Sequence, residues 1–152
     1  MGAEGCAGLQ PLRLLAQDED DLAILSAALQ DALVRRGDIT WEPKARRLTL
    51  RLTRFRWEAN PECARVVAAV QLGDVTRVRS RGIPRSRDAM LELLAVHYET
   101  VEAPGGALTF MFAGGADLQA HVECVDAVLA DLTESWPART APAHAHAEAA
   151  EE

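Results

Sequence analysis

The sequence lacks the short motifs by which many enzymes and nucleotide-binding proteins are recognised. No G-x-G-x-x-G or Walker sequence follows a predicted strand into a helix, and no serine stands in a G-x-S-x-G context. The chain therefore offers neither a phosphate-cradling glycine loop nor a nucleophile elbow. No apolar run reaches the roughly 18 residues that a transmembrane helix needs, so we expect no membrane span.

Cysteine is scarce, and its pattern argues against a disulfide scaffold. Cys6, Cys63 and Cys124 are odd in number, lie far apart and form no C-x-x-C pair. Such usage is typical of a reducing compartment. The N-terminus has no basic stretch followed by an apolar one, so it does not resemble a signal peptide. We therefore expect a cytoplasmic protein.

Charge is distributed unevenly along the chain. The net charge is −7, but residues 35–87 contain 14 Lys and Arg against 5 Asp and Glu. The remainder contains 2 Lys and Arg against 18 Asp and Glu. This asymmetry is the most distinctive global feature of the sequence. The length of 152 residues favours a single domain with one core.

The clearest strand spans Arg46 to Glu58 and also holds the densest run of arginine. Leucine alternates with threonine or arginine in its first half, which is the period of a strand with one buried face. Phe55 and Trp57 then fall on the opposite parity, so we expect a β-bulge near Thr53–Arg54 that returns both aromatic side chains to the core. The solvent face would then carry Arg47, Arg51, Arg54 and Arg56.

The other patterns predict an α+β fold with two amphipathic helices. Acidic residues before a leucine stripe predict an N-terminal helix that starts near Asp18 and runs to Arg36, where Gly37 ends it. A C-terminal helix is predicted from Val125 to Trp136. Between them we expect a curved antiparallel sheet or partly closed barrel of about seven or eight strands.

Two details of the sheet follow from parity and composition. The apolar segment 89–99 is assigned to a buried strand, although periodicity alone does not separate strand from helix there. In the glycine hairpin, alternation predicts a three-residue loop from Gly114 to Ala116 with Gly115 at positive φ. Residues 1–10 are expected to fray, residues 11–136 to form the domain, and residues 137–152 to be a disordered Ala/Pro/acidic tail.

Several stretches carry a resemblance to a known family. They are LRLLAQDEDDLAILSAALQDALV (12–34), RFRWE (54–58), RVRSRGI (77–83) and FAGGADLQAHVECVDAVLADL (112–132). Together they resemble a small bacterial family of uncharacterised proteins, a domain of unknown function. This resemblance implies no activity, cofactor or site residue. The order of elements is also similar to a pleckstrin-homology-type barrel, which likewise establishes no function.

Residues that could support catalysis are few and isolated. His121 and Glu123 match half of a zinc-deaminase motif, but the Pro-Cys-x-x-Cys half is missing. His144 and His146 lie in the tail, where no fixed tetrahedral metal site is expected. The sequence therefore assigns no catalytic residue, no cofactor and no metal, and it favours a non-enzymatic protein. The alternative is an enzyme with a pocket in which His97 or His121 meets Cys63, Cys124 or a carboxylate.

The arginines are the remaining candidate. If the strands at 47–56 and 75–81 are neighbours, they form a cationic face that suits carboxylate or phosphate groups. We predict a binding or assembly module, with an acidic protein surface, a second copy or a polyanion as partner, in that order. Nucleic acid is disfavoured because the chain is acidic and exposed aromatics are few. The candidate face consists of Arg47, Arg51, Arg54, Arg56, Arg77, Arg79 and Arg81.

Overall fold

The computed structural model describes residues 11–56 and 65–132. Within these ranges the chain forms nine strands and one helix. In chain order the elements are β1 Arg13–Ala16, α2 Glu19–Ala28, β2 Leu33–Glu42, β3 Arg47–Phe55, β4 Arg65–Leu72, β5 Val75–Arg81, β6 Met90–Glu102, β7 Gly105–Phe112, β8 Asp117–Val122 and β9 Ala127–Asp131.

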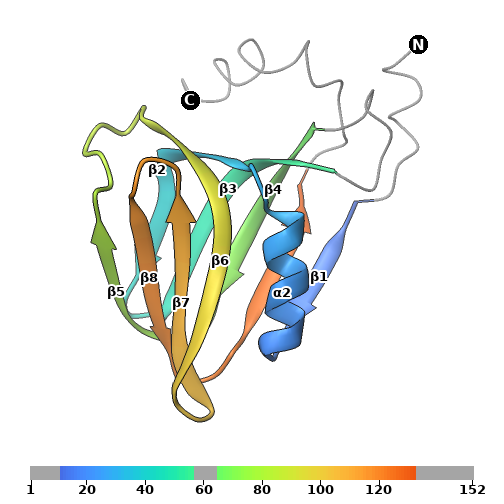
Figure 1. Ribbon diagram of the computed structural model, residues 1–152, viewed down its shortest axis with the longest axis vertical. Coiled ribbons are helices and arrows are strands. Elements are labelled where there is room, and N and C mark those ends of the chain that lie inside the picture. Colours follow the sequence, from blue (N-terminus) through green and yellow to red (C-terminus); the bar gives the residue numbers. More distant parts are fainter. Residues whose placement is uncertain (1–10, 57–64, 133–152) are drawn as a thin grey trace.

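All nine strands belong to one antiparallel sheet with the order β1-β9-β4-β3-β2-β6-β7-β8-β5. The sheet is strongly bent, so that β6, β7 and β8 lie in front of β2, β3 and β4 (Figure 1). It remains open, and β1 and β5 are its two edges. Strand β2 turns the corner at a register shift between Val34 and Ile39, where bulged residues bend a strand.

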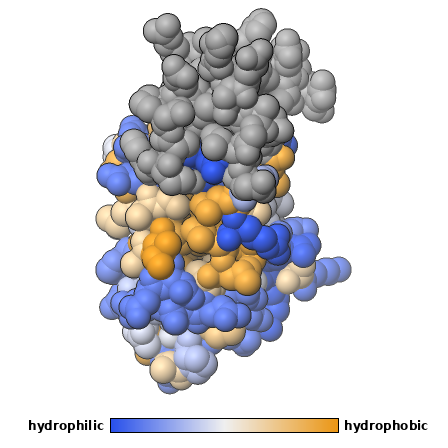
Figure 2. All heavy atoms as spheres, turned by 90° about the vertical axis from the view of Figure 1, so that its right-hand side faces the viewer, coloured by the Kyte–Doolittle hydropathy of each residue, from blue (hydrophilic) through white to orange (hydrophobic). Residues whose placement is uncertain are grey.

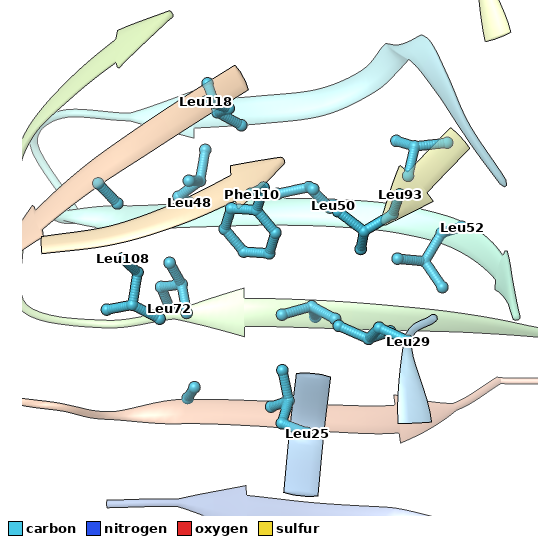
Figure 3. Packing of buried hydrophobic residues seen from close by; sticks show 14 of the residues in the cluster. Leu25, Leu29, Leu48, Leu50, Leu52, Leu72, Leu93, Leu108, Phe110 and Leu118 are labelled. Carbon is cyan, nitrogen blue, oxygen red and sulfur yellow. The ribbon is translucent and has the colours of Figure 1, made fainter. Parts of the chain in front are cut away.

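The core lies between the two halves of the bent sheet. Leu48 and Leu50 of β3 face Phe110 of β7, and Leu72 of β4 lies close to Leu108 of β7 (Figure 3). These five side chains are at most 1% exposed. Each one contributes roughly 1.5–3 kcal/mol of burial free energy. Leucine alternation in β3 thus predicts the inner face of this strand correctly.

Helix α2 packs against β1 and β6 at the open side of the sheet (Figure 1). Its N-cap is Asp18, whose Oδ1 accepts the backbone N–H of Asp21 at 2.8 Å, as predicted from the acidic start. Ser26 Oγ accepts the Val96 N–H of β6 at 2.9 Å. Figure 2 shows an apolar area on this side of the molecule, where β1 and α2 each carry a large exposed apolar side chain, Leu15 and Ile24.

The predicted fold class is wrong in its helices and in its strand number. Helix α2 ends at Ala28 and does not reach Arg36, because Asp31 has a φ of 67° and β2 starts at Leu33. Most of the predicted C-terminal helix within the described residues is β9, which pairs with β1 on one edge and β4 on the other. A short apolar segment suits either structure, and here two strand edges supply the hydrogen bonds.

The bulge predicted in β3 is also absent. Strand β3 pairs with β4 without interruption from Leu48 to Phe55, so Arg54 keeps the inward parity of Leu52. Phe55 points the other way and stacks under the Arg65 guanidinium, 4.6 Å from its ring centroid. Trp57 lies outside the described residues. The direction of the Phe55 side chain therefore follows the regular alternation of the strand and not its apolar character.

Two other predictions hold in part or in full. Residues 90–99 are strand, since β6 runs from Met90 to Glu102. The strand is not buried as predicted, because only Leu91 and Leu93 are buried and Met90 and Leu94 are exposed. The glycine hairpin has a three-residue loop with Gly115 at φ 90°, but the loop is residues 113–115, and Phe110 pairs with Leu118. The register differs from the prediction by two residues, which leaves every side chain on its predicted face. The predictions for residues 1–10 and 137–152 fall outside the described residues.

Candidate functional site

The seven candidate arginines do not lie on one pair of neighbouring strands. Strand β3 lies between β2 and β4, whereas β5 is an edge strand beside β8. The assumption that the strands at 47–56 and 75–81 are neighbours is therefore wrong. Each group has its own surroundings, and these decide which arginines are available to a partner.

Two of the candidates, Arg54 of β3 and Arg56 just after its end, are buried. Arg54 is 0% exposed and Arg56 is 7% exposed. Arg54 donates from Nε and Nη2 to the two carboxylate oxygens of Asp131, at 2.9 and 3.1 Å, and from Nη1 to the Phe55 carbonyl at 3.2 Å. Its charge is therefore neutralised inside the protein and serves the fold rather than a partner.

The other two arginines of β3 are on the outer face of the sheet. Arg47 donates from Nε to Glu42 Oε1 at 3.0 Å across the β2–β3 hairpin. This contact lowers the pKa of Glu42 and raises that of Arg47, through the hydrogen bond first and the Coulomb attraction second. Arg51 is exposed and stands opposite Ala69 of β4. Arg51 is thus separated from the arginines of β5 by the position of its strand.

The remaining three candidates form a compact set that we call the β5 arginine row, namely Arg77, Arg79 and Arg81. All three are exposed and share the outer face of β5. Their cross-strand neighbours on β8 are His121, Gln119 and Asp117, respectively. The strand pattern predicted this shared face correctly, because alternate residues of a strand point the same way.

The β5 arginine row continues into a polar network on β7 and β8. Arg77 Nη2 lies 3.4 Å from His121 Nε2, which in turn lies 3.0 Å from Gln119 Oε1. Gln119 Nε2 donates to Thr109 Oγ1 at 3.3 Å. Burial, followed by the charges of Arg77 and Arg79, lowers the pKa of His121. His121 is therefore neutral at pH 7, and it adds no charge to the row.

A second feature, the β2–β5 groove, lies between β2, β5 and the segment 82–89. Its volume is about 460 Å³, and Trp41, Val78 and Arg85 are among the residues that line it. The Val75 N–H donates to the Arg46 carbonyl at 3.0 Å where the β2–β3 turn meets β5. Segment 82–89 is held to β2 by backbone hydrogen bonds that Arg36 and Gly37 donate to the carbonyls of Ala89 and Arg87. No local pattern in the sequence indicates this groove, because its walls are far apart in the chain.

Among the described residues, the histidines and the cysteine of the alternative enzyme hypothesis are absent from the lining of the β2–β5 groove. His97 faces Thr109 across the β6–β7 pair, and neither His97 nor His121 lines the β2–β5 groove. Cys124 Sγ donates to Asp74 Oδ2 at 3.3 Å, and this bond, with burial, raises the pKa of the thiol. Cys63 lies outside the described residues.

The described ranges offer neither a metal cluster nor a membrane-spanning helix. Residues 11–56 and 65–132 contain no group of three or more His, Cys, Asp or Glu side chains that could hold a metal ion. The single helix in this part of the chain is too short to cross a membrane.

Comparison with known proteins identifies the family. Residues 12–144 match the family model described as "Protein of unknown function (DUF2948)", so the chain belongs to this family. No curated protein and no solved structure matches the chain. The expected family of unknown function is thereby confirmed, whereas the similarity to a pleckstrin-homology-type barrel is not.

Proposed function

We propose that this member of the family is a binding module whose β5 arginine row holds an acidic segment of a protein partner. The observation that carries the proposal is the presence of three arginines at alternate positions of one edge strand, all exposed on the outer face. Alternate residues of a strand lie about 7 Å apart. An extended acidic segment presents alternate carboxylates at the same spacing, so the two can pair residue by residue.

The charges of the row are available to a partner. Arg79 stands opposite the uncharged Gln119 and forms no ion pair with a carboxylate of the described residues. Arg77 contacts the neutral His121. Arg81 Nη2 lies 2.8 Å from Asp117 Oδ2, but the Arg81 side chain is 81% exposed, and exposed pairs of this kind contribute about 0–1 kcal/mol. A partner carboxylate can therefore replace Asp117 at little cost.

The same face favours carboxylate groups over nucleic acid. Within the described chain, the outward residues of β5 and β8 include no Phe, Tyr or Trp side chain on which a base could stack. Asp117 adds a negative charge beside Arg81, which weakens the attraction for a phosphate backbone. Discrete carboxylates of a protein segment can avoid Asp117, whereas a continuous phosphate chain cannot.

Fluorescence anisotropy with a labelled peptide of about ten glutamates tests the proposal. At about 50 mM salt the double variant R77Q/R79Q should bind about tenfold more weakly than the unaltered protein, since exposed charge pairs are individually weak and salt-dependent. The matched control is R13Q/R51Q, which also removes two arginines of the outer face. Arg13 of β1 and Arg51 of β3 lie at the same level of the sheet, joined across it by paired residues of β9 and β4. This control should keep most of the affinity.

Several outcomes would overturn the proposal. An equal loss in R77Q/R79Q and R13Q/R51Q would show a response to net charge only. Absence of binding at low salt would remove the proposed function. Tighter binding of an oligothymidylate of the same length, lost in R77Q/R79Q, would identify nucleic acid as the partner. Sedimentation of the protein alone as a dimer that R77Q/R79Q dissociates would identify a second copy.

A further inference from the structure

The β2–β5 groove has the composition of a small-molecule site. Its deep part contains Leu48 and Leu118, which are 0% and 5% exposed and belong to the core (Figure 3). Ile39 and Trp41 of β2 and Val78 of β5 add apolar surface to its sides. Its volume of about 460 Å³ falls within the range of ligand pockets, roughly 300–1,000 Å³. The groove can therefore enclose the apolar body of a small ligand.

Two arginines line the same groove without a carboxylate partner. Neither Arg36 nor Arg85 forms an ion pair with any Asp or Glu in residues 11–56 and 65–132. The neighbouring arginines behave differently, since Arg35 pairs with Asp38, Arg46 with Glu123 and Arg47 with Glu42. Two uncompensated guanidinium groups beside an apolar surface favour an anionic head group on the ligand.

The backbone around these arginines is held in place before any ligand binds. The Arg36 N–H donates to the Ala89 carbonyl at 2.8 Å, and the Gly37 N–H donates to the Arg87 carbonyl at 2.9 Å. Arg87 Nη2 donates in return to the Gly37 carbonyl at 3.3 Å. A Cβ at Gly37 would lie 3.1 Å from the Arg87 carbonyl oxygen, so glycine permits this close approach. The groove wall is thus preorganised, which lowers the cost of binding.

We infer that the β2–β5 groove binds a small ligand with an apolar body and a single carboxylate. The apolar body lies against Trp41, Val78 and the core leucines, and the carboxylate accepts hydrogen bonds from Arg36 and Arg85. This site is distinct from the β5 arginine row, because the side chains of the row point to the outer face whereas Val78 points inward.

Titration with decanoate, followed by amide chemical shifts in NMR and by calorimetry, tests the inference. We expect saturable binding with a Kd below about 1 mM and shifts concentrated in residues 36–41 and 78–85. The variant R36Q/R85Q should bind decanoate about tenfold more weakly. Loss of one hydrogen bond to a charged group is enough to weaken binding by about this factor. 1-Decanol, which has the same chain without the charge, should bind both proteins equally.

Three controls make the result specific. S80L places a larger side chain on a residue that lines the groove and should weaken decanoate and 1-decanol alike. R13Q/R51Q should leave decanoate binding unchanged, which separates the groove from a general charge effect. R77Q/R79Q should also leave it unchanged, so failure of the arginine row and failure of the groove are distinguishable. Thermal unfolding of each variant confirms that it is folded.

The inference is overturned by any of the following results. Decanoate shows no saturable binding up to about 5 mM, or R36Q/R85Q binds it as tightly as the unaltered protein does. The same holds if R13Q/R51Q loses as much affinity as R36Q/R85Q, or if the shifted amides lie outside the groove. Equal affinity of decanoate and 1-decanol would reject the anionic head group.

Discussion

Arg54 of β3 and Asp131 of β9 form a two-point ion pair in the interior, on either side of β4. The distances are 2.9 Å from Nε to Oδ1 and 3.1 Å from Nη2 to Oδ2, and both side chains are 0% exposed. Asp131 Oδ2 also accepts the Leu12 N–H at 2.8 Å. One carboxylate therefore joins β3, β9 and the residue before β1.

Replacement of Asp131 by asparagine should strongly destabilise the protein. The D131N variant removes the carboxylate that Arg54 contacts at two points in the interior, and loss of one partner of a buried pair costs about 3–5 kcal/mol. Urea denaturation should report a reduction of this size in the free energy of unfolding. R51Q, which alters an exposed arginine of the same strand, should change it by less than about 0.5 kcal/mol.

A double replacement separates the cost of removing one partner from the value of the pair. In R54M/D131L both charges are gone, and the free energy of unfolding should recover most of what D131N loses, because apolar residues often replace a buried ion pair without loss. A D131N variant within about 1 kcal/mol of the unaltered protein would contradict the structural role assigned to this pair.

This pair also shows why the arginine face could be predicted only in part. Parity alone placed Leu48, Leu50 and Leu52 inside and, continued, would have placed Arg54 inside as well. The bulge was predicted because the apolar Phe55 and Trp57 fall on the opposite parity. The aspartate that pairs with a buried Arg54 is 77 residues away in the sequence, so nothing near Arg54 opposed that prediction. The signal in the sequence for a buried partner was Asp131, a single aspartate at the end of the apolar segment that forms β9.

Acidification should lower the stability of the folded protein through His121. Its folded pKa is depressed below the usual value of about 6.5, so the unfolded chain binds more protons as the pH falls below about 6.5. This contribution to stability is therefore present above that pH and is lost on acidification through the unfolded and then the folded pKa. The variant H121Q should show a smaller loss between about pH 7 and pH 5 in thermal unfolding.

The same histidine should make partner binding depend on pH. Burial is the largest cause of the lowered pKa of His121, and the charges of Arg77 and Arg79 lower it further. An acidic segment that neutralises these two arginines relieves the second part of the shift. Binding should then take up protons, so the affinity for the glutamate peptide should rise as the pH falls from about 8 to about 6. In H121Q the affinity should stay flat over this range. An unchanged pH dependence in H121Q would exclude His121 from the binding face.

Removal of Asp117 should strengthen binding of an acidic partner. D117N releases Arg81 from its exposed ion pair. It also removes a negative charge that would repel the acidic partner. We expect a twofold to fivefold lower Kd for the glutamate peptide, which corresponds to about 0.4–1 kcal/mol. The free energy of unfolding should change by less than about 1 kcal/mol. Weaker binding by D117N would show that the peptide does not contact this end of the row.

Gly106 of β7 should tolerate no side chain. A Cβ there would clash with the Tyr98 hydroxyl and would lie 2.6 Å from the Glu99 carbonyl oxygen of β6. The rigid carbonyl belongs to the neighbouring strand, so G106A should lower the free energy of unfolding by about 1–3 kcal/mol in urea denaturation. G114A, at a position with φ 88° and no atom within 4 Å, should cost less, about 1 kcal/mol. Equal stability of G106A and the unaltered protein would contradict this packing.

The sequence supported some predictions because they depend on local spacing. The face shared by Arg77, Arg79 and Arg81 follows from alternation within one strand. Pairing between distant strands decides the secondary structure of Val125 to Leu132 and also forms the β2–β5 groove. The spacing of apolar residues along the chain does not encode this pairing. A segment such as Ala127–Asp131 becomes a strand because β1 and β4 present edges to it. Local pattern thus predicts faces, while tertiary contacts decide element type and site.

The proposed function requires an acidic partner to bind the outer face of β5. The most direct test is an NMR titration of the isotope-labelled protein with the glutamate peptide at about 50 mM salt. We expect the largest amide shifts to fall in residues 77–81 and 117–121 and to disappear at about 500 mM salt. Shifts that are spread over all exposed arginines, or that centre on Arg47 and Arg51, would contradict it.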